Sequence, residues 1–434
     1  MDNIFCTLVD SVLTHEGKSS SLYPSPRMYH KALGDYKNTP ADKSKYVVFE
    51  EANFYIDVKY QITAILGKGS YGTVCQARDV SVPDAPVEVA IKKVTNIFNK
   101  EILLKRAVRE LKLMKFFRGH KNIINLFDVE LVFERPYDGL YCFQELADYD
   151  LARVIHSSVQ FSEYHVQSFL YQILCGLKYI HSADVIHRDL KPGNILVTLQ
   201  GNLKICDFGL ARGISQQFLR HRSSTITNYV ATRWYRAPEL LLCKKVYSKA
   251  VDMWAVGCIF GELYARKPLF IGNDHIHQVH EILQVLGSPS RETVVKQFGT
   301  GSICTEMFHS TGGLDGTPNY KGLPWAEVLP YAPGKALNLL SKLLCWESSL
   351  RLSVDEVLDH PYLANVRDLD EEVNSSSHFD FSFESKNITL DDYKGLIHDE
   401  VKEFKFERMG RRGQMDFIEQ LYSQPSRSSH RVRN

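Results

Sequence analysis

The stretch VIHRDLKPGNILVTLQGNLKICDFGLA, residues 185–211, carries the strongest pattern in the chain. Two short apolar runs within it, ILV at 195–197 and LKI at 203–205, flank a turn that contains Gly201. Because glycine adopts the left-handed conformations that tight hairpins need, the two runs are predicted to pair as antiparallel strands centred near Gln200 and Gly201. The residues just outside the runs then meet at the open end of the hairpin.

Four polar side chains surround this open end. The predicted pairing sets Asn194 opposite Asp207, and two such oxygen donors can hold Mg²⁺, a hard cation that also bridges phosphates. Asp189, in the loop just before, can orient a substrate hydroxyl, and Lys191 can neutralise charge on a transferring phosphoryl group. Taken singly, each would more often be an ordinary polar loop residue. Their joint pattern predicts phosphoryl transfer from a metal-bound triphosphate.

A glycine-rich segment, GKGSYGTV at 67–74, lies upstream of this site. Its glycines leave room for backbone amides to approach phosphate oxygens. A dinucleotide-binding fold uses the same spacing but continues as a helix, whereas TVCQARDV here continues as a strand. The context favours a hairpin flap over ATP, although the motif by itself fits a structural glycine hairpin equally well. The predicted nucleotide contacts in this flap are Leu66, Gly67, Lys68, Gly69, Ser70, Tyr71, Gly72, Thr73 and Val74.

The next strand and helix supply a candidate ion pair. In VAIKKV, residues 89–94, the alternation of a strand puts Ala90 and Lys92 on one face, towards the expected adenine. The segment at 99–117 has apolar residues at helical spacing, with Glu110 at the margin of the apolar stripe. A carboxylate near the core is costly unless it is paired, so Glu110 is predicted to pair with Lys92 and to orient its amine towards the α- and β-phosphates. An ordinary surface glutamate fits this pattern less well.

A β-rich part is followed by a larger helical part. From Tyr60 to Val94, β-branched and aromatic residues alternate between turn signals, which predicts an antiparallel sheet. Beyond Leu151, long segments such as VDMWAVGCIFGELYA have helical periodicity. The predicted fold class is α+β, with a small antiparallel β lobe that holds one key helix and a larger, mainly helical lobe. The predicted divisions are a flexible extension at 1–53, a small lobe at 54–146, a large lobe at 147–363, an extension that packs back at 364–405 and a mostly disordered tail at 406–434.

Composition excludes several classes of protein. The chain has 52 Lys and Arg against 51 Asp and Glu, so no global field draws it to nucleic acid or to an anionic membrane. Its nine cysteines include no CxxC pair, which indicates reduced thiols and a cytoplasmic or nuclear location. No uncharged apolar run approaches the length of a membrane span, so we expect neither secretion nor membrane insertion. We expect a monomer.

The motifs GKGSYGTV, VAIKK, HRDLKPGN, DFG and APE occur in the order and rough spacing of the eukaryotic protein kinases, which the chain resembles over about residues 54–405. The resemblance implies a bilobal kinase fold and transfer of the γ-phosphoryl of ATP, and HRDLKPGN resembles the Ser/Thr class. It also implies that Glu239 pairs with Arg351 to brace the activation segment at 207–239, and that Asp252 holds the catalytic loop from below. Gln144 would be the gatekeeper, and Glu145 to Ala147 would be the hinge that hydrogen-bonds adenine.

The activation segment contains Thr227 and Tyr229, two residues apart, a spacing that resembles the TxY switch of the mitogen-activated protein kinases. The resemblance implies activation by phosphorylation of both residues, because phosphates order a loop where guanidinium groups converge. It further implies Pro-directed substrates. By the resemblance, Arg109, Arg188 and Arg212 would clamp phospho-Thr227, and Arg233 and Arg236 would receive phospho-Tyr229. Each arginine taken alone is more often a solvated surface charge, so this clamp rests mainly on the resemblance.

Two further features resemble the same family. An insert is expected at about 287–330, and Asp368, Glu371 and Glu372 stand where the family keeps an acidic docking patch for basic peptides of substrates and upstream activators. A solvated acidic loop would look the same. Asn228 departs from the Glu, Gly or Pro usual between the two phosphorylated residues, and it resembles a fungal branch that acts late in meiosis, in spore-wall assembly. Autophosphorylation of Tyr229 is the alternative to phosphorylation of both residues by an upstream kinase. A different fungal pathway, such as cell-wall integrity, is the alternative to the role in spore-wall assembly.

Two rival functions are weighed against an active kinase of this family. A catalytically weak or dead kinase fold that scaffolds partners is permitted by fold resemblance alone, but such proteins are expected to lose residues that are intact here, Lys92, Asp189, Asn194 and Asp207. A cyclin-dependent relative would be controlled by a bound subunit. The helix sequence RAVRELKLM and the Thr227 and Tyr229 pair oppose it.

Overall fold

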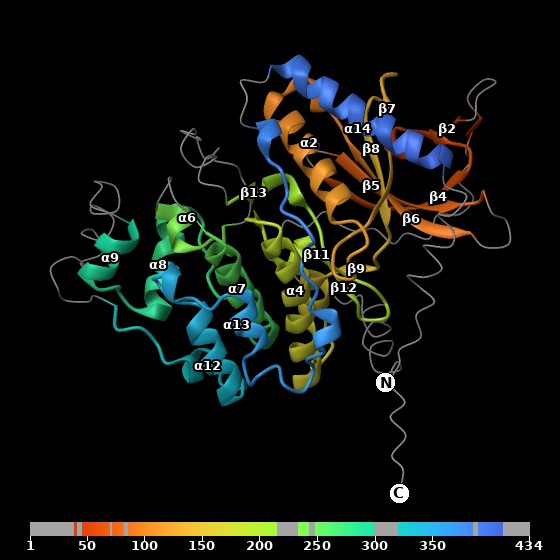
Figure 1. The fold of residues 1–434 in the computed structure, drawn as a ribbon. Coiled ribbons are helices and arrows are strands. Elements are labelled where there is room, and N and C mark those ends of the chain that lie inside the picture. Colours follow the sequence, from red (N-terminus) through yellow and green to blue (C-terminus); the bar gives the residue numbers. More distant parts are fainter. Residues whose placement is uncertain are drawn as a thin grey trace, which may run out of the picture.

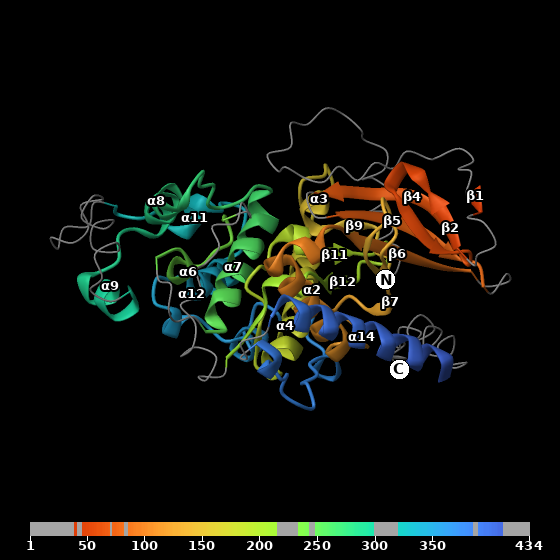
Figure 2. The same cartoon turned by 90° about the horizontal axis from the view of Figure 1, so that it is seen from above.

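The chain folds into a smaller lobe built around β-sheets and a larger helical lobe, which lie side by side in Figure 1 and, turned by 90°, in Figure 2. This arrangement confirms the predicted α+β class. No helix among the described residues is long and apolar enough to cross a membrane. The computed structural model describes residues 39–40, 46–69, 72–81, 86–214, 233–242, 248–298, 320–384 and 389–410.

A five-stranded antiparallel sheet of order β4-β5-β6-β8-β7 forms the centre of the smaller lobe. Helix α2 (Glu101–Phe116) packs beside it and buries Leu104, Val108 and Leu111 in one core cluster with residues of β7 and β8. The apolar stripe that predicted this helix is therefore the face that binds the sheet. The strands are β4 (Tyr60–Gly69), β5 (Gly72–Asp79), β6 (Val87–Val94), β7 (Leu126–Val132) and β8 (Gly139–Glu145).

A second, three-stranded sheet extends the smaller lobe at its N-terminal side. It consists of β1 (Thr39–Pro40), β2 (Tyr46–Phe49) and β3 (Phe54–Asp57). Phe49 and Phe54 are fully buried in a cluster with residues of β8. The prediction of a flexible extension up to residue 53 is therefore wrong from residue 46 onward. A strand of four residues gives little periodicity of its own, and this one is stabilised by the sheet against which it packs.

The larger lobe is organised around two long helices, α4 (Glu163–Ser182) and α7 (Ala250–Ala265). Helix α4 begins at a capping box in which Ser162 and His165 satisfy each other's backbone N–H groups. Helix α7 is apolar nearly all round and is buried accordingly. The other helices are α3 (Leu151–Ile155), α6 (Pro238–Leu242), α8 (His275–Leu286), α9 (Arg291–Phe298), α11 (Trp325–Val328), α12 (Gly334–Leu343) and α13 (Val354–Leu358).

The predicted hairpin is present as β11 (Ile195–Val197) and β12 (Leu203–Ile205). Ile195 pairs with Ile205 and Val197 with Leu203, so its centre lies at residue 200. A short strand, β9 (Tyr149–Asp150), adds to β11, and β10 (Val185–Ile186) pairs with β13 (Arg212–Gly213).

One detail of the predicted register is wrong. Continuing the ladder from Ile195 and Ile205 sets Asn194 opposite Cys206, whose backbone N–H donates to the Asn194 carbonyl at 3.0 Å. Asp207 comes one residue later and has a φ of 66°, in the left-handed region. The regular ladder therefore ends before Asp207, whose backbone leaves the strand conformation.

The C-terminal extension returns to the smaller lobe. Helix α14 (Leu390–Gly410) lies alongside α2 in both Figure 1 and Figure 2. Lys112 of α2 pairs with Glu400, and Lys115 Nζ lies 2.5 Å from Glu403 Oε2. The helix continues to Gly410, five residues beyond the predicted end of the extension at 405. These contacts tie the position of α2 to a segment that follows it by nearly three hundred residues.

Candidate active site

Lys92 and Glu110 form the ion pair that the sequence predicted. Lys92 Nζ lies 2.6 Å from Glu110 Oε1, joining the middle of β6 to the inner face of α2. Burial alone would lower the pKa of the Lys92 amine, but the carboxylates of Glu110 and Asp207 hold that pKa above its usual value. Lys92 therefore stays charged, under the influence of one carboxylate from α2 and one from the end of β12.

Asp189, Lys191 and Asn194 make one connected group on the loop between β10 and β11. Lys191 Nζ lies 2.7 Å from Asp189 Oδ2. The Asn194 amide nitrogen donates to the Asp189 carboxylate at 2.9 Å and to its backbone carbonyl at 2.8 Å. The Asp189 carboxylate is therefore held in one orientation before any substrate arrives.

Asp207 lies within reach of two lysine charges. Burial alone would raise the pKa of its carboxyl, but the positive charges of Lys92 and Lys191 outweigh burial and lower that pKa below its usual value. One carboxylate oxygen accepts from the Gly209 N–H at 3.3 Å, which fixes the side chain to its own turn. Asp207 is therefore ionised and oriented at the place where β12 ends.

The donor atoms here suit a metal ion that arrives with a nucleotide. Asn194 commits its amide nitrogen to Asp189, so its amide oxygen is the atom available to a metal, and Asp207 supplies a carboxylate. Among the residues that the structure describes, no group of three or more His, Cys, Asp or Glu side chains could hold a metal ion. An ion with few protein ligands keeps water and phosphate oxygens in its coordination shell. The set therefore fits a triphosphate-bound divalent ion.

The glycine-rich hairpin and the hinge lie on the sheet above these residues. Val74 of β5 pairs with Lys92 of β6, and Gly67 of β4 pairs with Val74, so the glycine-rich hairpin lies beside the strand that carries Lys92. A Cβ at Gly72 would lie 1.8 Å from the Lys93 carbonyl oxygen, which explains glycine there. Of the predicted nucleotide contacts, Leu66, Gly67, Lys68, Gly69, Gly72, Thr73, Val74 and Ala90 lie on these three strands, whereas Ser70 and Tyr71 lie outside the described residues.

At the hinge, the side chain of Glu145 is bound to the protein. Lys204 Nζ lies 2.7 Å from its Oε1, the Asn125 amide donates to Oε2 at 2.9 Å, and both Glu145 and Lys204 are buried. The Lys204 pair could not be predicted, because β12 and β8 are distant in the chain. Gln144 and Ala147 flank Glu145 on the same connection between the lobes.

Asp252 supports the catalytic loop from α7, as the family resemblance implied. Its carboxylate accepts from the backbone N–H groups of His187 and Arg188, each at 2.8 Å, and lies 2.9 Å from His181 Nε2. Burial alone would raise the pKa of Asp252, but these contacts, His181 foremost, lower it. His181 was missed in the sequence, since a histidine at the end of an apolar helix looks like an ordinary core residue.

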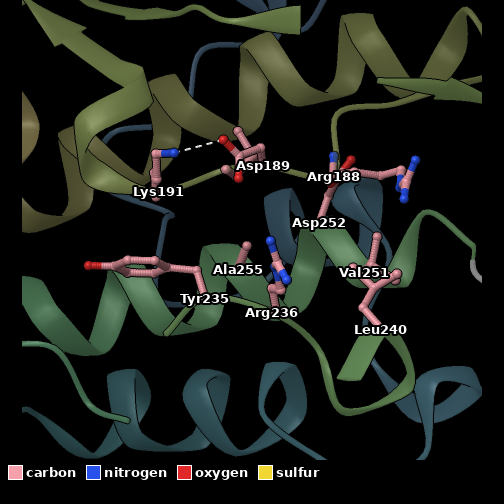
Figure 3. Close-up of a pocket in the computed structure, with 10 residues that line it drawn as sticks. Arg188, Asp189, Lys191, Tyr235, Arg236, Leu240, Val251, Asp252 and Ala255 are labelled. Atoms are coloured by element: carbon pink, nitrogen blue, oxygen red, sulfur yellow. Dashed lines mark hydrogen bonds and ion pairs between the residues drawn. The ribbon is translucent and has the colours of Figure 1, made fainter. Parts of the chain in front are cut away.

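A small pocket lies between the catalytic loop and α7 (Figure 3). In Figure 3 the Lys191 amine points at the Asp189 carboxylate, and Arg236 lies on the α7 side of the same space. Burial lowers the pKa of Arg236, and the nearby Asp189 opposes that shift. The pocket is lined by Arg188, Asp189, Leu190, Lys191, Tyr235, Arg236, Leu240, Val251, Asp252 and Ala255.

The predicted brace between Glu239 and Arg351 is also present. Two nitrogens of Arg351 lie 2.6 and 2.9 Å from the two oxygens of Glu239, and both residues are buried. Such a bidentate pair fixes the end of the activation segment to the large lobe.

We expect Glu239→Gln to lower the free energy of unfolding by ~3–5 kcal/mol, because it leaves the buried Arg351 charge without a counter-ion. Denaturant titration of the purified proteins measures this change. Glu347→Gln, which breaks an exposed pair with Lys296, is the control, and a loss at Glu239 no larger than the control's would contradict the prediction.

Three of the predicted phosphate-binding arginines meet at one turn. Arg109 donates to the carbonyl of Gly209 at 2.5 Å, Arg188 to that of Leu210 at 3.3 Å and Arg212 to that of Ala211 at 2.7 Å. Arg233 and Arg236 lie just before α6. Thr227, Asn228 and Tyr229 lie outside the described residues.

The three predicted docking residues lie around a short 3-10 turn (Leu369–Glu371) that follows α13. Asp368 caps this turn by accepting from the Asp370 N–H at 3.1 Å. Lys121 Nζ lies 2.7 Å from Glu371, and Arg367 Nε lies 2.7 Å from Glu372. Part of this acidic charge is therefore neutralised within the chain.

Comparison with known proteins agrees with this geometry. The protein kinase domain family matches residues 60–363. The chain is 56% identical over 379 residues to the sporulation-specific mitogen-activated protein kinase SMK1 of Saccharomyces cerevisiae, covering 86% of this chain and 96% of the relative. It is 45% identical over 369 residues to the mitogen-activated protein kinase SLT2/MPK1 of the same yeast, covering 84% and 74%. It is 44% identical over 353 residues to the mitogen-activated protein kinase mpkA of Aspergillus fumigatus, covering 81% and 80%.

Proposed function

Since this chain belongs to the mitogen-activated branch of the Ser/Thr protein kinases, we propose that it is an active enzyme that phosphorylates Ser or Thr residues followed by Pro, with Mg²⁺ as its metal ion. Kinases of this family use ATP and a divalent metal ion, and they act on protein substrates and respond to upstream activators. The observation that carries the proposal is the intact group of Lys92, Asp189, Asn194 and Asp207 around one cleft.

In this proposal, the protein binds and orients the triphosphate with a few charged groups. The Lys92 amine, held by Glu110, contacts the α- and β-phosphates. Asn194 and Asp207 would hold Mg²⁺, which would supply positive charge against the charge that develops on the phosphates. The glycine-rich hairpin covers the phosphates with backbone N–H groups, and Gln144 to Ala147 border the adenine.

Asp189 acts on the acceptor hydroxyl. Its carboxylate orients the substrate hydroxyl and accepts its proton as the phosphoryl group transfers, while Lys191, 2.7 Å away, stabilises negative charge on that group. Because Asn194 and Lys191 already hold Asp189, little reorganisation is needed at the moment of transfer.

The cellular role that we propose is in sporulation. The chain is 56% identical to a relative whose name describes it as sporulation-specific, against 45% for SLT2/MPK1 of the same yeast. The residue between the two candidate phosphorylation sites, Asn228, points the same way. Upstream activators and substrates would dock through basic peptides at Asp368, Glu371 and Glu372, where they would compete with Lys121 and Arg367 for the carboxylates.

The test is transfer from ATP to a Ser-Pro peptide by the purified full chain, with a Ser-Ala peptide as control and mass spectrometry of residues 207–239. We expect Thr227→Ala and Tyr229→Phe each to lower kcat by about tenfold or more, since each removes a phosphate that orders the activation segment. Full activity of the unphosphorylated protein would refute the switch. No transfer by the doubly phosphorylated protein would refute the kinase proposal in favour of a scaffold.

A further inference from the structure

Arg109, one of the residues expected to bind phospho-Thr227, already has a carboxylate partner. Its guanidinium forms an ion pair with Glu384 of the C-terminal extension and donates to the Gly209 carbonyl at 2.5 Å. The side chains of Arg109 and Glu384 are only 3% and 6% exposed. A carboxylate therefore lies buried against the guanidinium where the phosphate of residue 227 is expected to bind.

The neighbouring arginines define the same place. Arg109, Arg188 and Arg212 donate to three successive carbonyls, those of Gly209, Leu210 and Ala211. Their guanidinium groups thus converge on one turn, as an anion site requires. Glu384 enters this basic turn from a segment 275 residues away from Arg109 in the chain.

The segment that carries Glu384 is anchored by aromatic packing. In FDFSFE, residues 379–384, the ring of Phe381 lies against Gly213, where a Cβ would come within 2.6 Å of it. Phe379 packs edge to face on Phe116 of α2, with ring centroids 5.3 Å apart, and its N–H donates to the Ala183 carbonyl at 3.0 Å. This packing fixes Glu384 in position, so its carboxylate meets Arg109 at low cost in conformational entropy.

The contact lies within two residues, along the chain, of two parts of the active site. Arg109 precedes Glu110, the partner of Lys92, and Gly209 follows Asp207 in the metal-binding turn by two residues. A buried guanidinium that loses its counter-ion is strongly unfavourable, so α2 would shift to bring Arg109 to water. Such a shift would draw Glu110 away from Lys92.

We propose that Glu384 is a positioning residue that stands in for the phosphate of residue 227: its carboxylate holds Arg109, and through it α2 and the Gly209 turn, until phosphorylation replaces it. The proposal rests on the proposed kinase function and assigns a role to a residue outside the kinase motifs. It implies that the basal activity of the unphosphorylated enzyme depends on Glu384. The activity of the phosphorylated enzyme should not depend on Glu384. Phosphate, with more charge and three acceptor oxygens, would displace the carboxylate from Arg109.

The test compares Glu384→Gln in two states of the full chain, unphosphorylated and carrying phosphothreonine introduced at position 227 during synthesis. We expect Glu384→Gln to lower kcat of the unphosphorylated protein by about tenfold or more and that of the phosphothreonine protein by less than about twofold. Hydrogen exchange of the α2 amides, residues 101–116, should quicken in the unphosphorylated variant only. Glu384→Asp, which keeps the charge, should restore part of the activity.

The control is Glu403→Gln, which removes another ion pair between the extension and α2, that with Lys115, without touching Arg109. Glu403→Gln should change neither kcat nor the hydrogen exchange of the α2 amides in either state. An equal loss of kcat for Glu384→Gln in both states would mean that Glu384 is only a structural support, and it would overturn the proposal. No loss of kcat in either state would also overturn it. If the wild-type protein transfers no phosphate at all, the kinase proposal fails instead, and the exchange measurement still decides the role of Glu384.

Discussion

Asp189→Asn is expected to lower kcat for transfer to a Ser-Pro peptide by ~10²–10⁴-fold, the range that a positioned general base contributes. The amide keeps the shape of the side chain and its place on the loop, but it cannot accept the hydroxyl proton. It also removes the ion pair with Lys191, 2.7 Å away. The KM for ATP should change little, since the triphosphate is held by other residues. Steady-state kinetics with varied ATP and peptide measures both parameters.

A matched substitution on the same stretch separates chemistry from folding. Asp184→Asn removes a carboxylate that pairs with Lys249 at 3.1 Å and with His378 at 2.6 Å, and neither partner belongs to the candidate catalytic group. Asp184 has a φ of 58°, which asparagine also tolerates, so the backbone should stay as it is. We expect wild-type kinetics from this control and unchanged thermal unfolding from both variants. A kcat for Asp189→Asn within about threefold of wild type would remove Asp189 from the role of base.

The parts of the site that could be predicted are those whose structure is set by residues close together in the sequence. The hairpin of β11 and β12 followed from two apolar runs around Gly201, and its centre at residue 200 is confirmed. The placement of Asn194 opposite Asp207 missed by one residue, because the pairing rule extends a regular ladder and cannot foresee the left-handed turn at Asp207. The Lys92 and Glu110 contact could be predicted because strand alternation and helical periodicity each fix one side chain.

The contacts that were missed join distant segments through residues of ordinary local context. Glu384 ends the stretch FDFSFE, whose alternation of Phe with polar residues has the period of a strand and indicates only which side chains pack inward, so nothing near Glu384 indicates Arg109 as its partner. Lys204 and Glu145 belong to different strands of different sheets and meet only because the lobes are stacked at the hinge. Likewise, the residues of β2, Tyr46 to Phe49, form a strand because they pair with β3 and bury side chains in the core of the smaller lobe. Tertiary packing decides such elements, and local propensity does not.

Lys92→Arg is expected to lower kcat/KM for ATP by ~10²–10³-fold, comparable to removing one preorganised donor from a transition state. Charge is retained, so the loss tests geometry. The guanidinium is planar and longer than the amine, and it cannot at once keep the 2.6 Å contact with Glu110 and place one donor on two phosphates. Lys112→Arg, on α2 but paired with Glu400 on the far side from the cleft, is the control and should be near wild type.

The double variant with Glu110→Gln then decides whether the two residues act as one unit. If Glu110 works only by holding Lys92, removing it after Lys92→Arg should cost far less than removing it from the wild type, so the two losses should not add. Additive losses would mean that Glu110 contributes independently, for instance by fixing α2 against the sheet. A wild-type rate for Lys92→Arg alone would show that the amine does not orient the triphosphate. The surroundings of the Lys92 amine argue against that result. Glu110 of α2 and Asp207 raise its pKa and keep it charged, and Asp207 is the residue at which we propose that the metal-bound triphosphate binds.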